Sequence, residues 1–251
     1  MRTWLKIAAA GVLAVASQGA AQSAEITVWS GMGSYTGVRD LAEAFQKATG
    51  HTVKAVFETA INQKLLTNEP ADVIAGGPDQ IEDLIKLGKV VPGTHTPFTV
   101  APLGVSVKAG APKPDISTPE AFKAAMLAAK SVGYSRGCSG THAAEIIGKL
   151  GIADQMKPKI KLTGGGPVAE YLAKGDFEIG IQQNNVLVGV PGSDFVGALP
   201  ASIDKPCPFS LGLMKISTQP ILARAFITYA VSKEAGPILR KSLLDTAKLG
   251  S

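Results

Sequence analysis

The sequence of 251 residues is poor in the residue types from which metal and redox centres are built. It contains two cysteines, Cys138 and Cys207, and three histidines, His51, His95 and His142, which lie far apart along the chain. Their spacing does not resemble that of a zinc or copper site. We therefore expect neither a bound metal nor a cofactor.

A long hydrophobic run is also missing. The one apolar stretch near the start, residues 7–15, is too short to cross a membrane and follows the basic residues Arg2 and Lys6. This pattern predicts a signal peptide over residues 1–24, with small residues near its end as cleavage sites. No cysteine follows the run, so we expect an exported, periplasmic protein without a lipid anchor.

The chain has little charge. Charged residues make up 18% of the sequence, and the net charge is +5. Without Arg2 and Lys6, 23 basic residues remain against 20 acidic ones, a net charge of +3. A mild excess that is not clustered argues against a nucleic-acid partner. Export permits a disulfide between the two cysteines, and a pair of free thiols is an equal alternative.

The stretch at residues 131–151, SVGYSRGCSGTHAAEIIGKLG, combines a short strand, a loop of small polar residues and an amphipathic helix. A helix N-terminus offers unpaired N–H groups and the positive end of the helix dipole, so it favours an anion. Arg136, Ser139 and Gly140 lie in the predicted loop at residues 135–141. The ordinary alternative is a capped helix that binds nothing.

The same order occurs near the start of the mature chain. Residues 25–29 predict a strand, residues 30–37 a loop that contains Ser30, Gly33 and Ser34, and the apolar spacing from residue 38 an amphipathic helix. Loop solvation and N-capping are the alternative roles for these serines. Two loops with the same chemistry strengthen the prediction of an anion site.

Three further positions complete the candidate site. Thr59 follows a predicted strand at residues 52–57, and Gly165 lies in a run of three glycines that permits close backbone approach. Gln183 belongs to four consecutive amides, residues 182–185, which can donate to a ligand without adding charge. A flexible turn and a solvated loop are the respective alternatives for the glycines and the amides.

The alternation of strands and helices predicts an α/β fold with mostly parallel sheets. Two long extended segments, residues 98–107 and 209–216, are interpreted as crossings between two lobes, because a central strand tolerates Pro102 poorly. We expect one lobe from residues 25–104 with 208–251, a second from residues 105–207, and a cleft between them.

Several segments together resemble the periplasmic molybdate-binding protein family, the solute-binding subunits of ABC importers. The segments that carry the resemblance are ITVWSGMGSYTGVRDLAEAFQKATGHTV, NEPADVIAGGPDQIEDLIKLGKV, GCSGTHAAEIIGKLGI, YLAKGDFEIGIQQ and AFITYAVSKEAGPIL. The resemblance implies a type II periplasmic binding fold, an inner-membrane permease as partner, and a small oxyanion held by hydroxyl and backbone N–H donors. We expect a monomer.

The family's donor positions fall near Ser30 to Ser34, on Thr59, near Ser139, near Gly165 and on Gln183. Gln183 stands where the family has a tyrosine, and Arg136 has no counterpart in a site of neutral donors. The predicted ligand is a molybdate-like or tungstate-like oxyanion. The alternatives are a small organic carboxylate or another anion, and a sensory protein without a permease.

Arg136 separates the ligand classes. If it faces the cleft, a carboxylate matches its planar fork; if it faces solvent, which is the preferred reading, a tetrahedral oxyanion fits better. An enzyme is not expected. Cys138 and His142 are close in sequence, but Glu145 is the only acidic residue near them, and a helix would spread these side chains around its axis.

Overall fold

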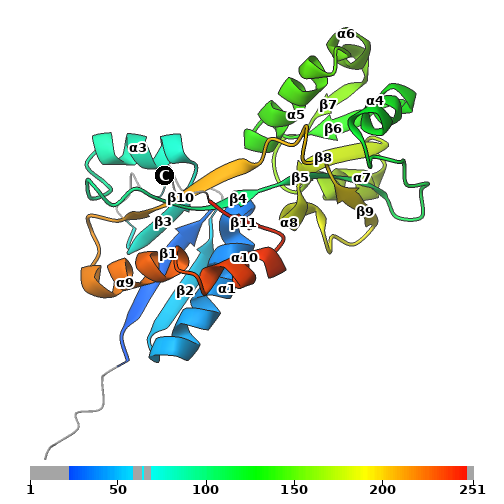
Figure 1. Cartoon of the computed structure of the whole chain (residues 1–251). Helices are drawn as coiled ribbons and strands as arrows, with labels where there is room; N and C mark the ends of the chain where they lie inside the picture. Colours follow the sequence, from blue (N-terminus) through cyan, green and yellow to red (C-terminus); the bar gives the residue numbers. More distant parts are fainter. Residues whose placement is uncertain (1–22, 59–63, 65–68, 248–251) are drawn as a thin grey trace, which may run out of the picture.

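The computed structural model describes residues 23–58, 64 and 69–247, so the predicted signal peptide falls largely outside the described part. Its strands form two separate sheets with helices packed on both faces of each, and Figure 1 shows them as two lobes. The predicted two-lobe α/β fold is confirmed, but both sheets mix parallel and antiparallel pairs instead of being mostly parallel. None of the described helices is long and apolar enough to cross a membrane.

The first lobe is built on a six-stranded sheet with the order β11-β4-β10-β3-β1-β2. β1 is parallel to β2 and β3, whereas β10 is antiparallel to β3 and β4. Its strands are β1 (Glu25–Ser30), β2 (Thr52–Phe57), β3 (Val73–Gly76), β4 (Thr96–Ala101), β10 (Cys207–Leu213) and β11 (Asp245–Thr246). Its helices are α1 (Met32–Thr49), α3 (Pro78–Lys86), α9 (Pro220–Ala230) and α10 (Ala235–Lys241).

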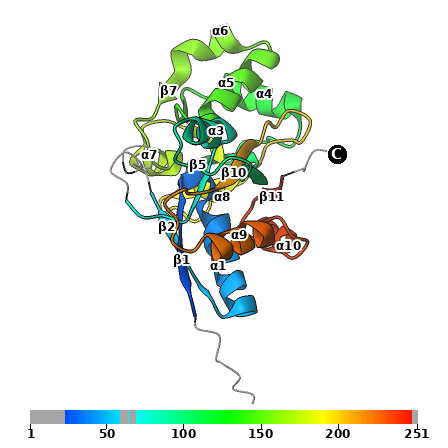
Figure 2. The same cartoon turned by 90° about the vertical axis from the view of Figure 1, so that its left-hand side faces the viewer.

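Consecutive strand residues face opposite sides of this sheet, and both sides are apolar because both are covered by helices. Val28 packs in the core shared with α1, α9 and α10, where Phe45 contacts the ring of Phe226. Trp29 packs on the other side against Ile81 and Leu84 of α3. Figure 2 also shows α1, α9 and α10 grouped at one end of the molecule.

The second lobe is built on a five-stranded sheet with the order β7-β6-β8-β5-β9. β6 is parallel to β7 and β8, and β5 is antiparallel to β8 and β9. Its strands are β5 (Leu103–Lys108), β6 (Val132–Tyr134), β7 (Ile160–Leu162), β8 (Ile179–Gln183) and β9 (Ser193–Ala198). Its helices are α4 (Pro119–Ala128), α5 (Cys138–Lys149), α6 (Ala153–Met156), η1 (Lys157–Lys159), α7 (Val168–Lys174) and α8 (Asn184–Leu187).

The chain crosses between the sheets at two places. Pro102 alone separates β4 from β5, and the return passes from β9 to β10. Asp204 lies on the return, and its Oδ1 accepts a hydrogen bond of 3.2 Å from the N–H of Leu103. Burial raises the pKa of Asp204 to about 6, against the lowering effect of the backbone donors. The first predicted crossing, residues 98–107, contains the break at Pro102, whereas residues 209–216 lie in and after β10, so the return crossing precedes the predicted segment. The exact lobe boundaries stay a prediction.

Two predicted loops are shorter than expected. α1 begins at Met32 and α5 at Cys138, so much of residues 30–37 and 135–141 is helical. The first turns of both helices contain Gly, Ser and Thr, which have low helix propensity and give no apolar face at helical spacing. Packing against the sheet stabilises these turns. The amides at residues 182–185 form the end of β8 and the start of α8, and three of the four are buried.

Candidate functional site

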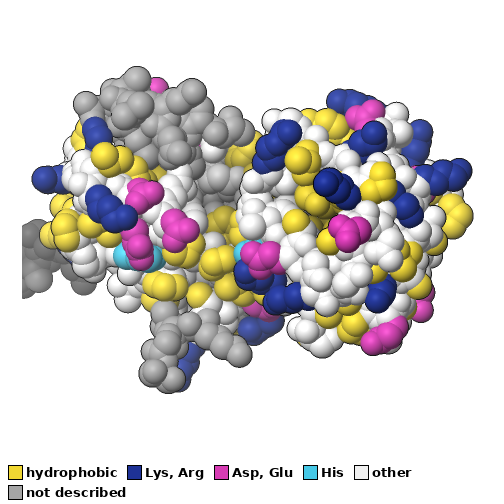
Figure 3. All heavy atoms as spheres, turned by 90° about the horizontal axis from the view of Figure 1, so that it is seen from above, with side chains coloured by type: hydrophobic (Ala, Val, Ile, Leu, Met, Phe, Trp, Pro, Cys, Tyr) yellow, Lys and Arg dark blue, Asp and Glu magenta, His cyan; other side chains and the backbone are white. Residues whose placement is uncertain are grey.

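A cleft of about 290 Å³ lies where the two lobes meet. Met32 and Gly33 line it from the first lobe, and residues 135–139, 163–166 and 182–183 line it from the second. Figure 3 shows the two halves of the molecule as separate masses joined at a narrower waist. The lining segments follow the carboxyl ends of β1, β6 and β7 and the end of β8, which is where open α/β sheets bind ligands.

Two helices begin at this cleft. Gly31 is the N-cap of α1 and Gly137 the N-cap of α5, and in neither helix does a side chain cap the first turn. The N-terminal N–H groups of both helices therefore lack side-chain acceptors, and the positive ends of two helix dipoles lie beside the cleft. One end comes from each lobe, so an anion in the cleft would be favoured by both.

The loop before α5 is held by serine hydroxyls. Ser139 is buried, and its Oγ lies 3.3 Å from the Oγ of Ser135, which also accepts a bond of 3.2 Å from the N–H of Gly137. Gly140 does not line the cleft. A Cβ at Gly140 would lie 1.6 Å from the carbonyl oxygen of Ser135, so only glycine lets the loop pack this closely on the helix.

Arg136 lies along the cleft and is exposed. Its guanidinium makes no ion pair or hydrogen bond with the described residues. Arg136 is thus both exposed, as the sequence favoured, and part of the cleft lining, so whether it contacts the ligand stays a prediction. A cation without an internal partner, next to an uncapped helix N-terminus, makes this end of the cleft strongly attractive to an anion.

The serines of the first lobe have a different position. Ser30 and Ser34 are fully buried, and neither lines the cleft. Their Oγ atoms lie 2.9 Å apart, and Ser30 donates to the carbonyl of Gly31 at 3.1 Å. Because a hydroxyl has one proton, Ser34 is then the donor to Ser30. The pair holds the start of α1, and Thr59 lies outside the described residues.

The run of four amides connects the lobes. Gln182 Oε1 accepts a bond of 2.7 Å from the N–H of Val168 at the start of α7. Asn185 Nδ2 donates to the carbonyl of Gly33 at 3.1 Å and to Thr36 Oγ1 at 3.0 Å, both in α1. The Nε2 of Gln183 lies 3.0 Å from where a Cβ of Gly33 would be. The run is thus an interlobe contact at the cleft.

Thr163 was missed by the sequence analysis. It follows β7, lines the cleft and is 3% exposed, and its Oγ1 has no hydrogen-bond partner in the described part of the chain. Its N–H donates to the carbonyl of Tyr134 at 3.0 Å, which fixes it beside β6. Its position directly before the glycines at residues 164–166 is a sequence signal that could have indicated a place at the cleft.

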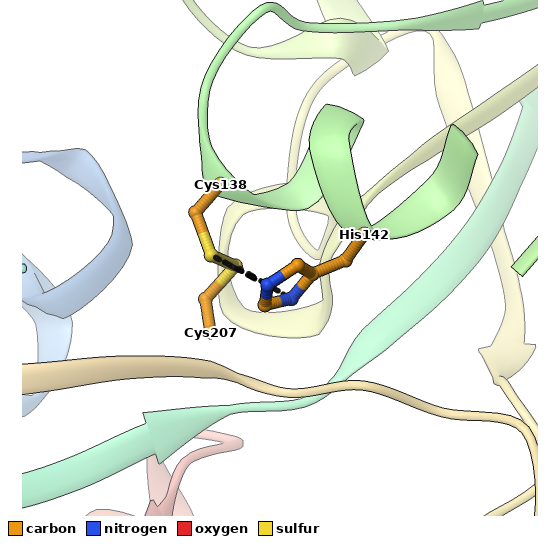
Figure 4. A group of neighbouring side chains, drawn as sticks. All are labelled: Cys138, His142 and Cys207. Carbon is orange, nitrogen blue, oxygen red and sulfur yellow. Dashed lines mark hydrogen bonds between the residues drawn. A yellow bond between two sulfur atoms is a disulfide. The ribbon is translucent and has the colours of Figure 1, made fainter. Parts of the chain in front are cut away.

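From the sequence, a disulfide and two free thiols were equal alternatives for the two cysteines. In the structure they form a disulfide between the start of α5 and the start of β10. His142 lies beside it, with its ring nitrogens 3.7–3.8 Å from Cys138 Sγ (Figure 4). Its Nδ1 donates to the carbonyl of Lys205 at 2.7 Å. The disulfide occupies both sulfur atoms. While it is intact, this group offers no thiolate to a metal or to a substrate.

Of the predicted site residues, the structure brings five together at the cleft: Gly33, Arg136, Ser139, Gly165 and Gln183. Ser30, Ser34 and Gly140 lie behind them, in the backbone supports of α1 and α5. None of these three residues belongs to the lining of the cleft, so their role as ligand contacts stays a prediction.

Comparison with known proteins gives a family match over most of the chain. The family described as bacterial extracellular solute-binding protein matches residues 26–242. An aconitate isomerase of Pseudomonas sp is 32% identical over 225 residues, which cover 86% of each chain. The molybdate-binding protein ModA of Rhodobacter capsulatus is 24% identical over 216 residues, 81% of each chain.

A solved structure gives the same fold. The periplasmic molybdate-binding protein of Azotobacter vinelandii matches with a TM-score of 0.70, and the alignment covers 89% of this chain and 100% of that one. The sequence identity over this alignment is 17%. The match therefore concerns the arrangement of the lobes rather than the residues of the cleft.

Proposed function

This chain belongs to the bacterial extracellular solute-binding proteins, and from that premise we propose that it captures a small organic carboxylate in the cleft between its lobes. The resemblance to the molybdate-binding proteins is confirmed for the family and the fold. The ligand is a separate question, because it depends on the few side chains at the cleft.

Arg136 carries the choice of ligand class. A site for a tetrahedral oxyanion can neutralise charge with hydroxyls and oriented N–H groups alone. An arginine in the lining adds a planar fork of donors, which matches a carboxylate with two parallel hydrogen bonds. The volume of about 290 Å³ is also at the lower end for organic ligands.

The relative named aconitate isomerase supports the same class, because aconitate is a six-carbon tricarboxylate. Its identity to this chain, 32%, exceeds the 24% of the molybdate-binding relative. We therefore place di- and tricarboxylates before molybdate and tungstate as ligands. The lobes would close on the ligand and present it to an ABC permease in the inner membrane, with the protein acting in the periplasm.

Isomerisation of aconitate is a second candidate function, favoured by that relative. Moving the double bond of aconitate requires removal of a proton next to it, and hence a general base. Among the described residues that line the cleft there is no carboxylate, imidazole or free thiol. Binding is therefore the first proposal, and isomerisation would need a base from outside this set.

The test is calorimetry with trans-aconitate, succinate, molybdate and sulfate. We expect the wild type to bind the carboxylates and Arg136→Gln to bind them at least about tenfold more weakly, since a charged pair is lost. Arg224→Gln, in α9 and outside the cleft lining, is the matched control and should bind as the wild type does.

Molybdate binding that is equal in wild type and Arg136→Gln, without carboxylate binding, would contradict the proposal. Incubation of the protein with cis- or trans-aconitate, followed by proton NMR, separates the two functions. A binding protein leaves the isomer unchanged, whereas an isomerase produces the other one. A neighbouring permease gene would distinguish transport from a sensory role.

A further inference from the structure

The second lobe presents a group of donors at the cleft that is separate from Arg136 and α5. It consists of Thr163 and the three glycines at residues 164–166, all of which line the cleft. The carbonyl of Gly165 accepts a bond of 3.1 Å from Tyr171, and that of Gly166 one of 3.4 Å from Gln182. In the described part of the chain, the N–H groups of the three glycines have no acceptor.

The hydroxyl of Thr163 adds an independent observation. It is buried at 3% exposure and unpartnered, although most buried hydroxyls find a hydrogen-bond partner. Leaving such a group without a partner costs free energy, which a ligand oxygen in the cleft would recover. Of the described residues with a buried side-chain atom that lacks a partner, Thr163 is the one that lines the cleft.

We propose that Thr163 and the glycine loop form a second anion subsite, so that the ligand carries at least two carboxylates. This inference rests on the proposed carboxylate-binding function. Arg136 and the start of α5 hold one carboxylate, and the Thr163 hydroxyl with the loop N–H groups holds another. A cluster of backbone N–H groups beside a hydroxyl is a general anion-binding arrangement.

The test compares succinate with succinamate, in which one carboxylate is replaced by a neutral amide of similar shape. We expect the wild type to bind succinate at least about tenfold more tightly, because hydrogen bonds to charged groups are the stronger ones. Thr163→Val, which replaces the hydroxyl by a methyl group, should lose most of this preference. Thr163→Ser keeps the hydroxyl and should retain it.

Ser106→Ala is the matched control, since Ser106 Oγ is also buried and unpartnered but does not line the cleft. It should bind succinate as the wild type does. A second measurement needs no ligand: Thr163→Val should unfold at a urea concentration no lower than the wild type, because it removes an unsatisfied hydroxyl. A clearly lower midpoint would mean that Thr163 is structural and would overturn the inference.

The two proposals fail differently. If the wild type binds no carboxylate, the proposed function is wrong and the second subsite falls with it. If the wild type binds succinate and succinamate equally, or Thr163→Val discriminates as the wild type does, only the second subsite is wrong. The cleft then binds a single carboxylate, and the hydroxyl of Thr163 makes hydrogen bonds only with water.

Discussion

At the scale of single residues, burial separates side chains of one type into different roles. Ser34 and Ser139 both lie in the first turn of a helix that begins at the cleft. Ser34 is paired with Ser30 and does not line the cleft, whereas Ser139 is paired with Ser135 and lines the cleft. Both hydroxyls therefore help to hold the start of a helix, but only that of Ser139 belongs to a residue of the cleft lining.

This contrast predicts different effects of two alanine substitutions on affinity. Ser139→Ala should weaken carboxylate binding by about 1–3 kcal/mol, the range for a lost hydrogen-bond donor in a buried site. Ser34→Ala should lower the free energy of unfolding by about 1 kcal/mol and leave the affinity unchanged. Calorimetry and urea denaturation measure the two quantities. Equal effects of both variants on affinity would contradict the separation of roles.

At the scale of elements, both helices that begin at the cleft are held in place by contacts with segments that are distant in the sequence. The disulfide ties the first residue of α5 to the first residue of β10, in the sheet of the other lobe. Asn185 ties the start of α8 to the first turns of α1. Such anchors keep the helix N-termini oriented, which electrostatic recognition of an anion requires.

The disulfide also closes a long loop, because 69 positions separate its cysteines. Its removal in Cys138→Ala/Cys207→Ala should lower the free energy of unfolding by about 2–4 kcal/mol, through the entropy that the unfolded chain regains. Urea denaturation of the variant and of the oxidised wild type measures this difference. A reductant should destabilise the wild type and leave the variant unaffected. An equal response of both proteins would show that the disulfide does not cause the difference in stability.

At the scale of the whole molecule, the two crossings, the disulfide and the amide run connect the two lobes. The first crossing is Pro102 alone, and the return over residues 199–206 is held to it by the bond from Leu103 to Asp204. Short crossings permit rotation of one lobe against the other about a hinge. The contacts from Asn185 to α1 would then stabilise the closed arrangement.

Closure can be measured directly. Saturating succinate or trans-aconitate should reduce the radius of gyration in small-angle X-ray scattering, because the ligand bridges both lobes. Asn185→Ala removes two interlobe hydrogen bonds and should weaken binding severalfold, with each bond worth about 1 kcal/mol. A scattering profile that stays constant while calorimetry reports a bound ligand would exclude hinge closure.

Much of this architecture follows from local sequence patterns. The alternating apolar runs predicted the strands, the spacing after residues 38 and 143 predicted two helices, and Pro102 predicted the break at the crossing. These signals are reliable because backbone sterics and side-chain periodicity act within a few residues. The quoted segments also identified the family, since they include both helix starts at the cleft.

The tertiary structure alone decided which side chains reach the cleft. The pairing of Ser30 with Ser34, the disulfide, the position of Arg136 in the lining and the unpartnered hydroxyl of Thr163 are absent from any local pattern. Each depends on how strands and helices distant in sequence pack together. A short segment determines its own helix or strand, but the burial of a hydroxyl is set by whatever the rest of the chain places against it.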